Sequence, residues 1–195
     1  MIQVQRSVIS HRGFTAFDIQ AIEIKIKIKT FGGFVQINET TRSDFEAFWP
    51  VFKEVVQAQE TYAFDPDIEF ESAYNLWCLS PEKSYVIKEK GLILGSYYIK
   101  PNASGPGKHI SNCGYMVAAK SRGKGVARKL CLHSQQVAIE LGYTAMQFNS
   151  VVSSNEVAVQ LWKKLGYKII GTIPNAYKHR RLGFVDSFIM HKQLT

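Results

Sequence analysis

The feature that most constrains the fold is a pair of glycines between a predicted strand and a predicted helix. Residues 109–119 are rich in strand formers, and residues 126–141 space apolar side chains for one helical face. Gly123 and Gly125 lie between them, and glycine permits conformations and close approaches that a Cβ forbids. The first turn of a helix has free N–H groups at the positive end of its dipole. The junction therefore predicts an anion-binding cradle.

Two common phosphate-binding loops do not fit this junction. The pattern G-x-G-x-x-G begins at Gly123 and Gly125, but Arg128 occupies the third glycine position. A P-loop would need a hydroxyl residue after Gly107-Lys108, where the chain has His109. The pattern that remains is Arg122-x-x-Gly125-x-Ala127.

Composition favours one globular domain and excludes several classes of site. The chain has 195 residues, of which 46% are hydrophobic and 21% charged. No run approaches the roughly 18 apolar residues of a membrane span. Its three cysteines are too few and too scattered for a disulfide framework or a zinc site, so we expect no metal. The odd number of thiols favours a reducing, cytoplasmic location.

The formal charge of +8 is compatible with nucleic acid, an acidic surface or a polyanionic cofactor. Most lysines are interpreted as a solvated surface. The exception is the basic cluster around the two glycines, which consists of Lys120, Arg122, Lys124, Arg128 and Lys129. No aromatic-basic recognition motif supports nucleic-acid binding.

Residues 1–30 are predicted to be an extension that precedes a domain of residues 31–195. Residues 1–17 contain no acidic residue, which loosely resembles an organelle-targeting peptide but lacks a convincing amphipathic helix. Residues 22–29 alternate with period two, as in a half-buried strand. The extension could add an edge strand, form a subunit contact, or be a translated upstream region without function.

The remaining chain alternates between strand and helix patterns. A helix is expected to start at Thr41–Asp44 and to kink or break at Pro50. A short helix is expected at 70–79, and loops at 60–67, 101–107 and 174–181. Strands are predicted at 34–39, 84–88, 92–100, 109–119, 144–151, 167–171 and 184–191.

Two segments of the chain resemble one family of enzymes. Arg122-x-x-Gly125-x-Ala127 resembles the acetyl-CoA signature of the GNAT superfamily of N-acetyltransferases. Residues 155–167 resemble the family's N-x-x-A-x-x-L-Y-x-x-x-G-F segment, in the same order and at the usual distance. The resemblance implies an α+β fold, with a twisted, mixed but mostly antiparallel central sheet and helices on both faces. It also implies acetyl-CoA as cofactor.

The resemblance carries over to particular cofactor-binding positions. Backbone groups of the strand before the cradle would pair with the pantetheine arm, with the Val117 N–H polarising the thioester carbonyl. Asn155 matches the asparagine that contacts the cofactor arm, although it could also cap the following helix. The implied cofactor-binding residues are Met116, Val117, Ala119, Arg122, Gly123, Lys124, Gly125, Val126, Ala127, Asn155 and Trp162.

The chain departs from the family pattern where acid and base are expected. Many relatives have a tyrosine at the position of Trp162, and its hydroxyl protonates the leaving thiolate. Many carry a glutamate on the strand where this chain has residues 109–115 without an acid. We expect Trp162 to pack against cofactor or core, and an ordered water to deprotonate the amine. Cys113 is interpreted as a core residue rather than a nucleophile.

Residues 34–195 resemble one branch more closely, the fungal N-acetyltransferases that detoxify azetidine-2-carboxylate and their bacterial relatives. There, strand asparagines hold an amino-acid substrate, which implies substrate binding by Asn112 and Asn149. Thr61 and Tyr62 belong to the loop that overhangs the acceptor site in this fold, although Tyr62 could equally be a core residue. Asn149 and Asn155 are the catalytic candidates.

The sequence thus predicts an acetyl-CoA-dependent N-acetyltransferase for a small-molecule amine, such as an amino acid or a proline analogue. Three alternatives remain open: acetylation of a protein or peptide amine, a catalytically inactive acyl-CoA-binding module, and a basic nucleic-acid-binding protein. We expect neither nucleic-acid nor membrane binding, and a homodimer is possible.

Overall fold

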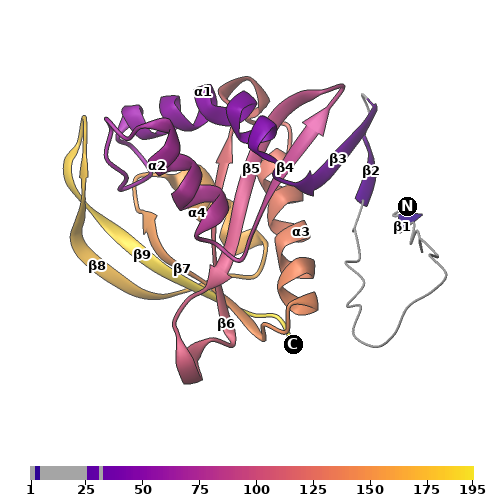
Figure 1. Ribbon diagram of the computed structural model, residues 1–195. Helices are drawn as coiled ribbons and strands as arrows, with labels where there is room; N and C mark the ends of the chain where they lie inside the picture. Colours follow the sequence, from indigo (N-terminus) through magenta and orange to yellow (C-terminus); the bar gives the residue numbers. More distant parts are fainter. Residues whose placement is uncertain (1–2, 5–25, 31–32) are drawn as a thin grey trace.

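The computed structural model describes residues 3–4, 26–30 and 33–195, in which one sheet has the strand order β1-β2-β3-β4-β5-β6-β7-β9-β8 (Figure 1). The strands are β1 (Gln3–Val4), β2 (Ile26–Thr30), β3 (Gly33–Glu39), β4 (Lys83–Glu89), β5 (Leu92–Pro101), β6 (Ile110–Val117), β7 (Ala145–Val152), β8 (Lys168–His179) and β9 (Gly183–Gln193). Every described pair is antiparallel except β6 with β7. The predicted mixed, mostly antiparallel sheet is confirmed.

Helices cover both faces of the sheet, as expected. They are α1 (Arg42–Ala58), α2 (Phe70–Tyr74), α3 (Val126–Glu140) and α4 (Glu156–Lys164), and a π-helical turn, Asn75–Leu79, extends α2. One core lies under α1 and α2 and includes Phe45, Trp77 and Met116. The other includes Leu130 of α3 and Trp162 of α4. Neighbouring residues of β5 and β6 alternate between these two cores, because successive strand side chains point to opposite faces.

The helix α1 starts where the sequence predicts it but continues through Pro50. Thr41 and Asp44 form a capping box at its start. The predicted break at Pro50 is wrong, because the helix extends to Ala58. A proline inside a helix costs about 3 kcal/mol. Five apolar side chains are buried along this helix, and each contributes about 1.5–3 kcal/mol, which offsets that cost.

The predicted basic loop at 174–181 is also wrong over most of its length. Strand β8 continues to His179, and the turn to β9 occupies residues 180–182. The pairing of β8 with β9 shifts between Ile173 and Tyr177, and Asn175 has a φ of 52°. This bulge accommodates Pro174, which lacks an N–H, so the strand can continue. Tyr177 and His179 are buried beyond it.

The strand pattern predicted at residues 22–29 falls partly outside the described residues. Residues 26–30 form β2, which pairs with β3 on one side and β1 on the other. Residues 22–25 are not among the described residues, and the same holds for most of the segment 1–17.

Candidate functional site

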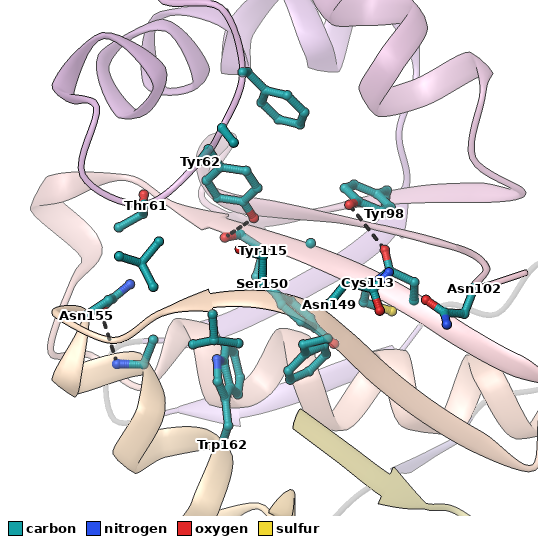
Figure 2. A pocket seen from close by; sticks show the side chains of 18 of the residues that line it. Thr61, Tyr62, Tyr98, Asn102, Cys113, Tyr115, Asn149, Ser150, Asn155 and Trp162 are labelled. Carbon is teal, nitrogen blue, oxygen red and sulfur yellow. Dashed lines mark hydrogen bonds between the residues drawn. The ribbon is translucent and has the colours of Figure 1, made fainter. Parts of the chain in front are cut away.

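A split between β6 and β7 creates the main cavity. The two strands pair only at Ile110 with Ala145 and at Ser111 with Met146. Beyond that point they diverge, and a cavity of about 450 Å³ lies along the gap. Figure 2 shows Thr61 and Tyr62 on one side of this cavity and Trp162 on the other. Parallel strands that diverge in this way leave a ladder edge open to a ligand.

The edge of β6 that faces the gap directs backbone polar groups into it. Successive residues of a strand direct their N–H and C=O groups to opposite sides. On the β7 side the carbonyl of His109 accepts a hydrogen bond from Thr144 N (3.0 Å). On the β5 side Ala118 N donates to the Leu94 carbonyl (2.9 Å). The backbone groups of residues 113, 115 and 117 therefore point toward the gap.

Along this edge, Tyr115 and Val117 have different partners. The Tyr62 hydroxyl donates to the Tyr115 carbonyl (2.9 Å). The N–H of Val117, the predicted donor to a thioester, faces the gap. Met116 instead directs its backbone to β5, where it is paired with Ser96, and its side chain is buried under α1. Val117, but not Met116, thus has its backbone oriented as the sequence predicts. The third predicted residue, Ala119, lies in the turn after β6, where its carbonyl accepts a hydrogen bond from Arg122 N (3.2 Å).

A bulge in β7 directs Asn149 and Ser150 into the cavity. Phe148 pairs with Met190 and Val151 with Phe188, so two residues of β7 oppose one residue of β9. Both bulge side chains are exposed and line the cavity. A bulge re-aims side chains relative to a regular strand, and here it presents the Asn149 amide to the cavity.

The loop between α1 and α2 closes over the cavity and is tied to the turn of β8 and β9. The Tyr177 hydroxyl donates to the Tyr62 carbonyl (3.1 Å), and Arg180 N donates to the Gln59 carbonyl (3.1 Å). Arg181 and Glu60 form an ion pair at 3.0 Å. We call these three contacts the roof of the cavity. Thr61 and Tyr62, predicted to lie at the acceptor site, both line the cavity below it.

The glycine-rich junction forms the predicted start of a helix. Strand β6 ends at Val117, a 3₁₀ turn covers Ala119–Ser121, and Gly125 is the N-cap of α3. Gly123 and Gly125 have φ of 75° and 71°, and a Cβ built on either meets no atom within 4 Å. Within the described part of the chain, the N–H groups of residues 123–128 make no hydrogen bond to protein. Free donors around an open space are what a pyrophosphate requires.

Both predicted residues of α4 contact the cavity. The Asn155 side chain accepts a hydrogen bond from Ala158 N at 3.3 Å, so it caps the helix, and it also lines the cavity. Trp162 is 7% exposed and packs with ring centroids 5.1 Å from Tyr115 and 5.2 Å from Phe148. Its position is that of a packing residue on the cavity wall, as expected.

The cavity contains little acid–base chemistry. Among the described residues that line it, Lys100 is the one charged side chain. Burial raises the pKa of Tyr98 to about 12 and raises the pKa of the Cys113 thiol. Neither group is ionised near neutral pH, which argues against Cys113 as a nucleophile. No cluster of metal-ligating side chains occurs in the described residues.

Several residues that line the cavity were not predicted from sequence, among them Tyr98, Lys100, Ser150 and Tyr177. Tyr98 and Lys100 are two residues apart on β5, so period-two alternation could have placed them on one face. Tyr177 gave no signal, since it lay in a predicted loop.

No helix in the described ranges is long and apolar enough to span a membrane.

Comparison with known proteins points to one family. The sequence model of the Acetyltransferase (GNAT) family matches residues 41–167. A GCN5-related N-acetyltransferase from Kribbella flavida is 41% identical, with a TM-score of 0.78 over 82% of this chain and 97% of that chain. The structure of yncA from Salmonella typhimurium, with its cofactor acetyl-CoA, is 20% identical, covers 83% of this chain and 94% of that one, and gives a TM-score of 0.71, a likeness of fold alone.

A curated relative matches over a shorter region. N-acetyltransferase aca1 of Schizosaccharomyces pombe is 35% identical over 101 residues, which are 51% of this chain and 48% of that protein. The chain therefore matches about half the length of this relative. The family match covers most of the chain, and it coincides with the split sheet and the glycine cradle, so the chain belongs to the GNAT family of acetyltransferases.

Proposed function

We propose that this protein transfers the acetyl group of acetyl-CoA to the amine of a small molecule. The observation that carries the proposal is the continuity between two features. Free N–H groups at the start of α3 lie one short turn after β6, and β6 exposes its backbone edge to the cavity. An anion site leading into an open strand edge suits a long cofactor with a pyrophosphate at one end and an amide-containing arm.

The residues around both features fit acetyl-CoA. The N–H groups from Gly123 to Ala127 would hold the pyrophosphate, since the Arg122 N–H donates to the Ala119 carbonyl (3.2 Å). The exposed side chains of Arg122 and Lys124 add positive charge. When bound, the cofactor supplies the acetyl thioester. The N–H of Val117 faces the gap and can donate to a carbonyl oxygen there, which is the electrostatic assistance that acyl transfer needs.

The roof supports a small acceptor over a protein terminus. Its three contacts tie the loop between α1 and α2 to β8 and to the turn that follows it, and we expect a loop held in this way to leave less room for an extended polypeptide. A lysine side chain or a polyamine would also bring positive charge to a cavity in which Lys100 is the one charged side chain among the described lining residues. An amine that carries a carboxylate, such as an amino acid or a proline analogue, complements this charge.

The acceptor amine must lose a proton before it attacks. None of the described lining residues is a carboxylate or a histidine, so we assign deprotonation to ordered water in the cavity. The Asn149 amide, presented by the bulge, would orient the acceptor. Asn155 would contribute to cofactor binding while it caps α4.

Thiol release from acetyl-CoA tests the proposal. The panel should contain azetidine-2-carboxylate and proline, their carboxamides, a polyamine and a peptide with a free N-terminus. We expect the two amino acids to stimulate release above hydrolysis. Release with the peptide or polyamine alone would overturn the assignment of a small carboxylate-bearing acceptor.

One rival is a binding module that has lost catalysis. The observation in its favour is Trp162 at the position of a general acid. If the protein bound acetyl-CoA but released no thiol with any amine, this rival would replace the enzyme assignment.

A further inference from the structure

Side chains replace backbone hydrogen bonds at the point where β6 and β7 separate. The last backbone pair is Ser111 with Met146. There the Ser111 hydroxyl donates to the Ala145 carbonyl (3.1 Å), and one residue further along the Asn112 amide donates to the Gln147 carbonyl (3.0 Å). These two bonds hold the strands together where the regular ladder has ended.

Both polar atoms of the Asn112 side-chain amide form hydrogen bonds to protein. Its Nδ2 donates to Gln147 of β7, and its Oδ1 accepts from the Tyr98 hydroxyl of β5 at 3.4 Å. The residue is 7% exposed. Asn112 thus connects three strands, and each polar atom of its amide already forms one hydrogen bond to protein.

Asn149 differs from Asn112 in its exposure and in the partners of its Nδ2. It is exposed, it lies in the bulge, and its Oδ1 accepts a hydrogen bond from Gln147 Nε2 (2.9 Å). Its Nδ2 has no protein partner among the described residues, so it remains available to a ligand. Gln147 lies between the two asparagines and bonds to both.

We propose that Asn112 is a positioning residue, which acts through Gln147 to set the divergence of β6 from β7 and the orientation of Asn149. The role in acetyl transfer rests on the function proposed above. The tie between the strands is a property of the protein alone. Without the Asn112 tie, the gap would widen, and both the exposed edge of β6 and the Asn149 amide would lose their defined positions.

Hydrogen–deuterium exchange of the free protein tests the tie without any ligand. Asn112→Leu removes both hydrogen bonds while it keeps the branched shape and the number of side-chain heavy atoms. We expect faster exchange of the backbone amides in peptides covering β7, by about fivefold, the effect of one lost hydrogen bond. Asn149→Leu is the matched control, since it removes an exposed side-chain amide from β7 itself. It should leave the exchange of the β7 amides unchanged.

Kinetics then separate positioning from direct binding. We expect Asn112→Leu to lower kcat and to weaken acetyl-CoA binding, each by about fivefold or more. Asn149→Leu should mainly raise the KM of the amine. Tyr98→Phe should have a partial effect alone and no further effect in the Asn112→Leu background, because it acts through the same amide.

Unchanged exchange and unchanged acetyl-CoA affinity in Asn112→Leu, with a raised amine KM, would overturn the proposal in favour of direct substrate contact. If Asn112→Leu did not fold, Asn112→Asp would decide, since it keeps the shape and loses the donor to Gln147. If the wild-type protein did not bind acetyl-CoA, the proposed function would fail, and the exchange result would still decide whether Asn112 ties the strands.

Discussion

A methyl group at Gly114 would test the packing that holds the cavity together. Gly114 lies on β6, and a Cβ built there meets Tyr98 Cε1 at 2.5 Å, Tyr98 Cζ at 2.9 Å and the Tyr62 hydroxyl at 3.1 Å. Ordinary contacts are about 3.5–4 Å, so in Gly114→Ala the Tyr98 ring must move by roughly 1 Å. That ring packs on Trp77 at 5.0 Å between centroids, and its hydroxyl is 3.4 Å from Asn112 Oδ1.

The cost follows from these contacts. Overpacking costs about 1–3 kcal/mol, and loss of the hydrogen bond to Asn112 adds about 1 kcal/mol. We therefore expect the free energy of unfolding to fall by about 2–4 kcal/mol, with Tm lower by on the order of 10 °C. Urea unfolding and calorimetry give both values.

Gly171→Ala on β8 is the matched control. A Cβ there meets its nearest atom, on Ile189, at 3.6 Å, so this variant should be neutral or slightly stabilising. Acetyl transfer by Gly114→Ala should fall at least tenfold, because Tyr62 and Tyr98, which both line the cavity, are displaced. A Gly114→Ala protein as stable and active as Gly171→Ala would refute the close approach of Tyr98 and Tyr62 to β6.

Two further predictions concern charge. Lys100→Met should raise the KM of a carboxylate-bearing amine about threefold to tenfold and leave the KM of its carboxamide unchanged. Thiol-release kinetics with the two amines measure both values. Equal effects on both amines would show that Lys100 does not recognise the acceptor carboxylate. Burial lowers the pKa of His133 from 6.5 to about 4, and the ring contacts the Tyr97 hydroxyl at 2.8 Å. The unfolded chain binds this proton at a higher pH than the folded chain does. The free energy of unfolding should therefore keep its full value above pH 6.5 and fall as the pH drops toward 4, by about 2 kcal/mol between pH 7 and 5. Urea unfolding at both pH values should show this loss, and His133→Gln should reduce it; an unchanged slope in the variant would assign the titration to other groups.

The cradle could be predicted from sequence because its chemistry is local. Gly123 and Gly125 adopt left-handed conformations that other residues rarely take. The sequence pattern that contains these two glycines therefore also predicts the backbone conformation of the cradle. The N-cap of α1 at Thr41 is predictable for the same reason, since it depends on residues within one turn.

The cavity itself depends on contacts that local patterns do not encode. The divergence of β6 from β7 and the bulge at Asn149 depend on which backbone pairs are missing or shifted between strands that are distant in the sequence. The roof joins residues more than a hundred positions apart, such as Tyr62 and Tyr177. Sequence alone placed Asn112 and Asn149 on strands, but could not reveal that both polar atoms of Asn112 are bonded to neighbouring strands, whereas Asn149 is exposed and bonded through its Oδ1.

The start of α3 is proposed to bind the pyrophosphate of acetyl-CoA. Thermal unfolding with and without the cofactor tests this proposal most directly, in the wild type and in two glycine variants. Gly125→Glu places a side chain and a negative charge in the cradle. Gly142→Glu is matched to it, because Gly142 also has a positive φ (86°) and open space but lies beyond the other end of α3.

Acetyl-CoA at about 100 times its Kd should add about 2.7 kcal/mol of stability, which is roughly 5–10 °C in Tm for a chain of this size. We expect this shift in the wild type and in Gly142→Glu, and its loss in Gly125→Glu. A full shift in Gly125→Glu, or no shift in the wild type at millimolar cofactor, would contradict the proposed pyrophosphate site.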